Sequence, residues 1–174
     1  MSSPSRFSHY VLRTNRPEEL VKWYCTVLDA HVVYTNGKLN FLTYDSEHHR
    51  IAIIAGERLN EKPPQPSVGM YHAAFGFNTL KELMDNYERL RGKDIVPYRS
   101  VNHGPTLSLY YRDADMNDVE LMWATLKDAT AADEFMRTEI FARTPMGLKV
   151  EPDDLLAKHR AGVPDADLVS WPGA

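Results

Sequence analysis

The order of apolar and polar residues near the N-terminus predicts a strand followed by an amphipathic helix. Residues 7–14 are typical of a strand. The helix is expected to begin near Asn15 or Arg16, with Pro17 in its first turn, where the missing N–H of proline does no harm. The apolar positions that recur at helical spacing are Leu20, Val21, Tyr24, Val27 and Leu28. One face of this helix is therefore expected to be buried.

Three strand-like runs follow this helix. The runs cover residues 31–34, 39–44 and 50–55. Asn36 and Gly37 form a typical turn between the first two runs. Residues 56–68 contain three prolines and are expected to form a linker without regular structure. The strand, the helix and the three runs form a first βαβββ module, residues 6–55.

After the linker, the same order of elements recurs. A strand is expected at 70–77 and a helix at 80–91, and Gly92 ends this helix. Further strands are expected at 95–100, 106–112 and 119–124. These elements form a second module, residues 69–124.

The two modules match at a fixed offset. His9 and His72 are 63 positions apart (72 − 9) and occupy corresponding places in the first strands. The same offset maps Leu20 to Leu83, Val21 to Met84, Tyr24 to Tyr87 and Val27 to Leu90. A chance match between two amphipathic helices is the alternative. We predict an α+β fold in which two βαβββ modules form one curved mixed sheet around a metal cleft.

Residues 125–174 do not continue this repeat. Residues 130–143 have the apolar spacing of a helix, with Thr130 as its N-cap, and residues 151–159 predict a second short helix. Residues 144–147 are expected to form a turn, and the final segment is expected to be extended. This helical tail carries no chemistry of its own, and we expect it to pack on the modules or on a neighbouring subunit.

The composition excludes several classes of protein. Hydrophobic residues make up 43% of the 174 residues and charged residues 25%, as in soluble globular proteins. A net charge of −4 provides no basic field for nucleic acid or anionic lipid, so neither partner is expected. No apolar run approaches the ~20 residues of a membrane span, and the N-terminus lacks a secretory signal. Cys25 is the only cysteine, which favours a reducing, cytoplasmic location.

Three side chains in the predicted strands suggest a metal site. His9 and His72 occupy matching positions, and Glu120 lies in an apolar strand, where an unpaired carboxylate is costly. Two neutral imidazoles and one carboxylate suit non-haem Fe(II) or Mn(II) and leave open positions, whereas a structural zinc site closes four ligands. The alternatives are histidines that only form hydrogen bonds in the core and a glutamate that faces water.

Further histidines are suited to proton transfer. His48 and His49 precede the fourth strand, where adjacent side chains point to opposite faces, so at most one enters the cleft. His103 precedes the strand with Tyr110 and Tyr111. A solvated hairpin edge and a surface-loop histidine are the respective alternatives. The histidines that fit no such group are His31 and His159.

Two stretches outside the metal residues carry a resemblance to a known family. The first is His48-His49 before an apolar strand. The second runs from residue 101 to residue 120 and contains His103, Leu109, Tyr110, Asp113 and Glu120. Over about residues 6–124, the chain resembles the vicinal oxygen chelate superfamily and, within it, the type I extradiol ring-cleavage dioxygenases.

The resemblance implies a role for each candidate residue. It implies that His9, His72 and Glu120 bind Fe(II), with Mn(II) as the alternative metal. It also implies that His49, with His48 beside it, is the acid and base of the reaction. It further implies that His103 and Tyr110 form hydrogen bonds to oxygen or to the catecholate. Tyr110 is preferred to Tyr111 because it lies ten residues before Glu120 (120 − 110), which is the family spacing.

The chain departs from the family in two ways. Ala114 and Met116 stand where the family has proline and glycine, so the turn before Glu120 is expected to differ. Most members also carry two such domains in tandem. One module pair, residues 6–124, with a tail at 125–174, implies a single-domain enzyme.

The implied activity is that of an oxidoreductase of aromatic catabolism. It would use Fe(II) and O₂ to open a catechol, aryl-substituted catechols included, to a muconic semialdehyde type product, and we expect a homo-oligomer. One alternative is a metal-dependent isomerase or lyase of the glyoxalase kind, which needs a fourth ligand, usually glutamate or glutamine. Glu57 and Gln65 are nearby in sequence, but they lie in or beside the linker, a poor place for a rigid ligand. The other alternative is a ligand-binding member without activity.

Overall fold

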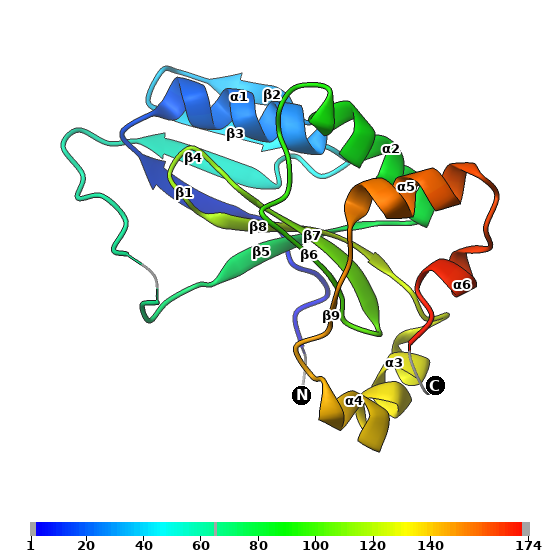
Figure 1. The fold of residues 1–174 in the computed structure, drawn as a ribbon. Helices are drawn as coiled ribbons and strands as arrows, with labels where there is room; N and C mark the ends of the chain where they lie inside the picture. The colour runs from blue at the N-terminus through cyan, green and yellow to red at the C-terminus, as the bar shows by residue number, and fades with distance from the viewer. Residues whose placement is uncertain (1–2, 65, 172–174) are drawn as a thin grey trace. The chain divides into compact units, whose positions relative to one another are not determined.

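Figure 1 shows the computed structural model of the chain, which describes residues 3–64 and 66–171. The chain divides into two compact units. The first unit is Met1–Gly69 with Asp113–Asn117, and the second unit is Met70–Arg112 with Asp118–Ala174. None of the helices in the described residues combines the length and the apolar character that a bilayer crossing requires.

The first unit contains a four-stranded sheet in the order β1-β4-β3-β2. The strands are β1 (Tyr10–Thr14), β2 (His31–Thr35), β3 (Leu39–Thr43) and β4 (Ile51–Ala55). β1 and β4 are parallel and the other pairs are antiparallel. Helix α1 (Pro17–Leu28) packs on this sheet and buries Leu20, Tyr24 and Val27, so the predicted buried helix face is confirmed (Figure 1).

β1 is shorter than the sequence predicts. It begins at Tyr10, so His9 lies just before the strand and not inside it. The guanidinium of Arg50 donates hydrogen bonds to the carbonyl oxygens of Phe7 (2.8 Å) and Ser8 (3.1 Å). A side chain from another part of the chain therefore bonds the backbone groups that a longer strand would have presented to β4.

The second unit contains a five-stranded sheet in the order β5-β8-β7-β6-β9. The strands are β5 (His72–Phe77), β6 (Arg99–Asn102), β7 (Thr106–Arg112), β8 (Asp118–Ala124) and β9 (Leu148–Lys149). β5 and β8 are parallel, as β1 and β4 are in the first unit. Helix α2 (Leu80–Arg91) has the predicted bounds, and a capping box between Thr79 and Glu82 fixes its start.

The predicted α+β class and the repeated βαβββ order are confirmed, but the prediction of a single sheet is wrong. Hydrogen bonding divides the described strands into two mixed sheets, one from each module. β6 begins at Arg99 and not at residue 95, because Pro97 has no N–H for a strand ladder. Residues 56–64 and 66–68 contain no helix or strand.

The predicted helix at 130–143 is two helices, α3 (Ala129–Met136) and α4 (Glu139–Arg143). The break occurs because Thr138 caps the second helix, its hydroxyl accepting a hydrogen bond from the N–H of Phe141 at 3.2 Å. Asp128, and not Thr130, caps the first helix. No side chain of α3 or α4 is fully buried.

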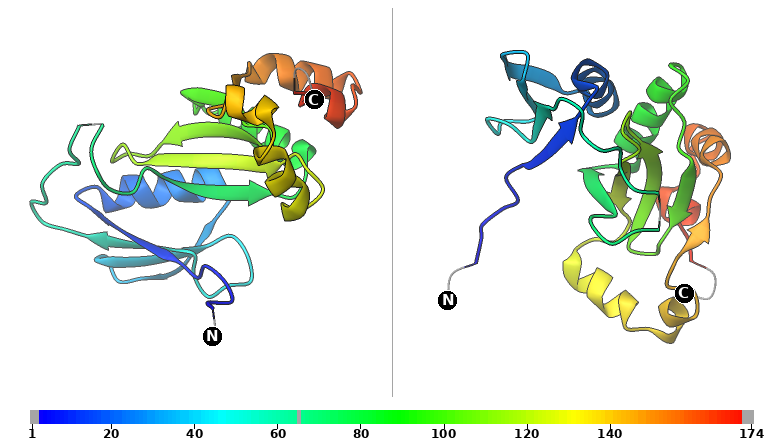
Figure 2. Two further views of the ribbon diagram at one scale, coloured as in Figure 1. Left: turned by 90° about the horizontal axis from the view of Figure 1, so that it is seen from below. Right: turned by 90° about the vertical axis from the view of Figure 1, so that its left-hand side faces the viewer.

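After these helices, the chain returns to the second sheet. β9, which the sequence does not predict, pairs with β6 and forms the edge of the second sheet. Helix α5 (Pro152–Arg160) then lies beside α2 (Figure 2), where the hydroxyl of Tyr87 donates to Asp153 at 2.8 Å. A short helix, α6 (Asp165–Leu168), occupies part of the segment that was predicted to be extended.

Candidate active site

A row of hydrogen-bonded side chains lies on one face of the second sheet. His72 is the first residue of β5, and its Nε2 atom lies 2.8 Å from Oε2 of Glu120 in β8. The hydroxyl of Tyr110 in β7 donates to Oε1 of Glu120 at 3.2 Å. Glu120 is only 7% exposed. The predicted alternative of a glutamate that faces water is therefore excluded.

The strand register explains why these side chains meet. Glu120 stands opposite Tyr110 across β7 and β8, and opposite Ala74 across β5 and β8. Paired residues share a face of the sheet, and so do residues two apart along one strand. His72, two positions before Ala74, therefore points to the same face as Glu120. Tyr111 points to the opposite face, where it is almost fully buried.

His103 extends this row. Its Nε2 atom lies 2.9 Å from the hydroxyl oxygen of Tyr110. Because the single proton of Tyr110 is donated to Glu120, the ring nitrogen of His103 must be the donor to Tyr110. Burial, helped by Glu120, raises the pKa of Tyr110 to about 12, so the hydroxyl keeps its proton at neutral pH. Burial also lowers the pKa of His103, which favours the uncharged ring.

His72 and Glu120 fit two ligands of one divalent cation. Donor atoms bound at right angles to such an ion lie about 3 Å apart, close to the 2.8 Å that separates Nε2 from Oε2. An imidazole nitrogen and a carboxylate oxygen also suit Fe(II) or Mn(II). Nδ1 of His72 is buried and has no hydrogen-bond partner among the described residues, so Glu120 and the adjacent rings of Tyr71 and Tyr110 orient the imidazole.

A second group of histidines lies in the first unit. The ring centroid of His49 lies 4.3 Å from that of His9 and 4.4 Å from that of Phe41, with which it is stacked. The Nδ1 atoms of His48 and His49 are 2.6 Å apart. Burial is the main cause that lowers the pKa of His49, and the neighbouring rings of His9 and His48 lower it further.

The prediction that His48 and His49 point apart is wrong. Both residues lie in the loop before β4 and not in the strand, so the alternation of strand side chains does not apply to them. His48 is largely exposed, as the hairpin-edge alternative requires, whereas His49 is partly covered by Phe41 and His9.

The turn before Glu120 forms despite the departures from the family. Met116 adopts a left-handed φ of 62°, a conformation that favours glycine. The carboxylate of Asp113 accepts hydrogen bonds from the N–H groups of Asp115 at 2.9 Å and Asn117 at 2.8 Å. Hydrogen bonds that this carboxylate accepts therefore stabilise the turn where the family has proline and glycine.

The predicted site residues thus form two groups, one in each unit. The group in the second unit is His72, His103, Tyr110 and Glu120, and the group in the first unit is His9, His48 and His49. Within either unit, the described residues contain no set of three side chains arranged to hold a metal ion. Glu57, a candidate fourth ligand, is exposed, and Gln65 lies outside the described residues.

Arg99 is a residue that the sequence analysis missed. Its guanidinium carbon lies 5.3 Å from the ring centroid of Tyr110. The feature that indicates a role for Arg99 is its pairing with Tyr110 across β6 and β7. That register depends on where β6 begins, which local pattern did not reveal.

The comparisons with known proteins agree with this fold. The model of the Glyoxalase/Bleomycin resistance protein/Dioxygenase superfamily matches residues 6–121. Biphenyl-2,3-diol 1,2-dioxygenase 2 of Rhodococcus globerulus is 40% identical over 164 residues, which are 94% of this chain and 86% of that protein. Biphenyl-2,3-diol 1,2-dioxygenase 3 of the same organism is 41% identical over 172 residues, covering 98% and 90%.

Solved structures share the fold at lower identity. Lactoylglutathione lyase from Agrobacterium tumefaciens is 20% identical with a TM-score of 0.56, covering 70% of this chain and 96% of that one. A glyoxylase/bleomycin resistance protein/dioxygenase domain from Frankia sp. EAN1pec is 20% identical with a TM-score of 0.58, covering 70% and 99%. The chain therefore belongs to the Glyoxalase/Bleomycin resistance protein/Dioxygenase superfamily and, through its relationship to the dioxygenases, is an oxidoreductase of that superfamily.

Proposed function

We propose that the protein is an extradiol dioxygenase that uses Fe(II) and O₂ to open a catechol to a muconic semialdehyde type product. The observation that carries this proposal is the row His103–Tyr110–Glu120–His72, in a chain 40% identical to a protein named as a biphenyl-2,3-diol 1,2-dioxygenase. The catalytic domain is residues 6–124, and the tail is residues 125–174.

The metal ligands in this proposal are His9, His72 and Glu120. Two neutral imidazoles and one carboxylate are a donor set that Fe(II) prefers, and Mn(II) accepts the same set. When bound, the metal would hold the catechol and O₂ side by side and so remove most of the entropic cost of their encounter. Support for the ligand set comes from the 2.8 Å approach of His72 to Glu120.

His49 is the group that takes up and returns a proton in the proposed reaction. Contact with Phe41 and His9 keeps its ring partly out of water, which favours the uncharged form that can accept a phenolic proton. His48 has its Nδ1 atom 2.6 Å from that of His49 and is largely exposed. It therefore provides a path for that proton to solvent.

Tyr110 and His103 stabilise negative charge that develops on oxygen. Tyr110 keeps its proton at neutral pH, and the ring nitrogen of His103 donates a hydrogen bond to the tyrosine oxygen. A well-placed donor of this kind lowers a reaction barrier by about 3 kcal/mol. Strand register fixes the position of these side chains before a substrate arrives, and the Tyr110 hydroxyl, which donates to Glu120 in the free protein, would turn its proton toward the substrate oxygen when Glu120 binds the metal.

We further propose that the protein forms a homo-oligomer. β2 is one of the two edge strands of its sheet, and it exposes Val32, Val33 and Tyr34. An exposed apolar edge strand is a surface on which a second strand can pair. Light scattering on the purified protein tests this, and a mass equal to one chain of 19.9 kDa contradicts it.

Anaerobic loading tests the proposed activity. The protein is loaded with Fe(II), mixed with a catechol and then exposed to air, and a yellow ring-opened product is expected. Parallel loading with Mn(II) tests the alternative metal. If a panel of catechols, aryl-substituted ones included, gives no yellow product with either metal, the proposal is wrong. Isomerisation of a hemithioacetal by the Zn(II)- or Ni(II)-loaded protein would favour the glyoxalase kind of activity instead.

A further inference from the structure

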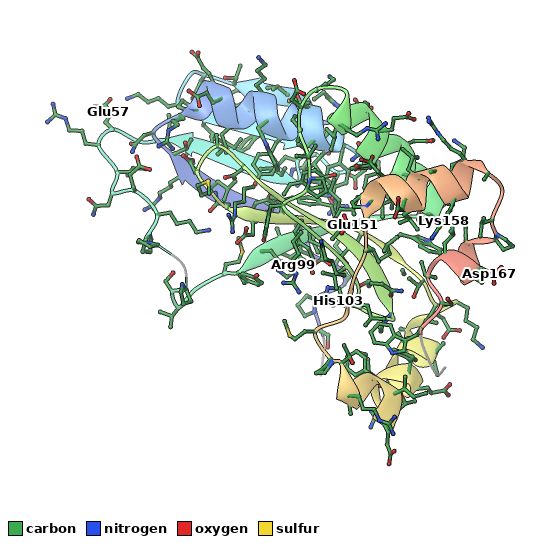
Figure 3. All side chains as sticks on the ribbon, viewed as in Figure 1. Glu57, Arg99, His103, Glu151, Lys158 and Asp167 are labelled. Carbon is green, nitrogen blue, oxygen red and sulfur yellow. The ribbon has the colours of Figure 1, made fainter. Side chains whose placement is uncertain are left out.

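Arg99 stands in line with the candidate site. The register places Arg99 opposite Tyr110 across β6 and β7, and Tyr110 opposite Glu120 across β7 and β8. All three side chains therefore point to the same face of the second sheet. The guanidinium of Arg99 lies against the ring of Tyr110, at 5.3 Å from its centroid, and Figure 3 labels Arg99 together with His103.

The positive charge of Arg99 is not neutralised within the part of the chain that the structure describes. Its guanidinium is half-buried and has neither a hydrogen bond nor an ion pair with a described residue. Arg112, which also lies over a tyrosine ring, is by contrast paired with Asp118 at 3.0 Å. A half-buried guanidinium with five unused donors is costly unless an acceptor reaches it.

A cavity of about 340 Å³ opens beside Arg99. Val101 and Met146 give it apolar walls, and Lys149, whose ammonium is paired with Glu151 at 2.6 Å, lies at its rim, so Arg99 is the unpaired positive charge among the described residues of this cavity. None of the described residues that line it is acidic. The wall opposite β6 is the turn at Gly147, whose φ of 84° allows it to pack closely against the strand.

The distance between neighbouring strands determines how long a substrate must be to extend from Glu120 to Arg99. Neighbouring strands lie about 4.8 Å apart, so Arg99 is about 10 Å from Glu120 along the sheet. A catechol held at Glu120 covers this span with its ring and a short side arm. An uncharged arm would displace water from the guanidinium without replacing the lost hydrogen bonds. A carboxylate, by contrast, accepts two parallel hydrogen bonds from the guanidinium.

We propose that Arg99 binds a carboxylate on a side arm of the catechol, so that acidic catechols are the preferred substrate class. This inference rests on the proposed dioxygenase function. It makes Arg99 a specificity-determining residue, and it gives the C-terminal segment a role as the wall of the subsite.

The test compares a vicinal dihydroxyphenylpropanoate with its uncharged carboxamide. For the Fe(II)-loaded protein, kcat/KM is expected to be about tenfold to a hundredfold higher for the carboxylate, because a charged hydrogen bond is lost with the amide. Arg99→Gln should abolish this preference, mainly through a higher KM for the carboxylate. Arg99→Lys keeps the charge without the planar fork and should retain part of the preference.

Arg143→Gln is the matched control. Arg143 in α4 is 78% exposed, so this variant removes the same charge from the same unit without touching the cavity, and the preference should stay within about twofold of the wild type. Circular dichroism of each variant checks that it is folded. Equal use of carboxylate and amide by the wild type, or an unchanged preference in Arg99→Gln, overturns the inference while the dioxygenase proposal stands.

A binding measurement separates this inference from the proposed function. Phenylpropanoate, which lacks the hydroxyl groups, is titrated calorimetrically into the metal-free protein. Binding that is about tenfold weaker in Arg99→Gln than in the wild type supports the carboxylate subsite even if no catechol is cleaved. Equal binding by both proteins counts against the subsite, whatever the result with catechols.

Discussion

Nε2 of His72 and Oε2 of Glu120 lie 2.8 Å apart, although the two residues are 48 positions apart (120 − 72) in the chain. They meet because β5 and β8 are parallel neighbours, with Glu120 opposite Ala74. A half-buried imidazole and a buried carboxylate therefore share one face of a sheet, which is a rigid support for a ligand pair.

Replacing Glu120 with Gln should strongly weaken iron binding, so that iron is lost from the protein. The amide keeps the shape of the side chain but lacks the charge that a divalent cation requires, and metal affinity should fall by about tenfold to a hundredfold or more. Metal analysis after anaerobic loading measures this. Glu139→Gln, at a residue whose side chain is 94% exposed in α4, is the matched control and should keep its iron. Full iron occupancy in Glu120→Gln would remove this residue from the ligand set.

Replacing His49 with Ala should leave iron bound and reduce turnover of a catechol by about 10²- to 10⁴-fold, the usual contribution of a general acid or base. Steady-state kinetics and metal analysis on the same preparation separate the two effects. His48→Ala, at the neighbouring and more exposed ring, should reduce turnover less. Unchanged turnover in His49→Ala would exclude a proton-transfer role for it.

Replacing Tyr110 with Phe should reduce kcat by about a hundredfold, because it removes the donor that lies against Glu120. Tyr111→Phe is the control in the same strand. The hydroxyl of Tyr111 is buried and has no hydrogen-bond partner among the described residues, so its loss should leave activity and stability unchanged or improved. Equal kinetic effects of the two substitutions would contradict the assignment.

Replacing Met116 with Gly should stabilise the protein by about 1 kcal/mol, because the left-handed conformation costs a side-chain-bearing residue more than glycine. Met116 is 55% exposed, so little packing is lost. Urea unfolding measures the change. Met70→Gly, at an exposed position without a positive φ, should be destabilising. A loss of stability in Met116→Gly would show that the turn does not strain this residue.

Replacing Asp153 with Asn should lower stability at neutral pH but not in acid. The hydrogen bond from Tyr87, followed by those from Arg91, lowers the pKa of Asp153 below its usual 3.8. A lowered pKa in the folded state contributes stability above the ordinary value, and this contribution is lost as the pH falls through the folded-state pKa. Thermal unfolding from pH 7 to pH 2 measures the difference between wild type and variant.

The difference in unfolding midpoint should therefore shrink as the pH falls below 3.8. Asp154→Asn, the neighbouring carboxylate on the same helix, is the control and should behave like the wild type at every pH. A difference that is as large in acid as at neutral pH would mean that Asp153 acts through packing and not through its charge.

Local signals made some elements predictable from the sequence. α2 has its predicted bounds because Thr79 and Glu82 form a capping box and Gly92 follows its last residue. Tyr110 was preferred to Tyr111 because of a spacing of ten residues before Glu120 (120 − 110), and the hairpin register of β7 and β8 places it opposite Glu120.

Contacts between distant parts of the chain account for what the sequence did not reveal. His9 lies outside β1 because the guanidinium of Arg50 donates hydrogen bonds to the backbone carbonyls before the strand. Arg50 is 43 positions from Phe7 in the chain. β9 has only two residues, and its pairing with β6 leaves no periodic pattern. Arg99 was missed for a related reason, since its importance follows from a register with Tyr110 and not from its neighbours in sequence.

The close approach of Gly147 to β6 has an evolutionary consequence. A Cβ at this position would lie 2.6 Å from the carbonyl oxygen of Asn102, so any larger residue would push the turn outward and widen the hollow next to Arg99. One wall of that hollow therefore comes from residues outside the two modules, while β6 supplies the other. Descendants of this chain can change which molecules fit by editing the carboxyl-terminal extension alone, while the strands that carry the ionisable groups stay as they are.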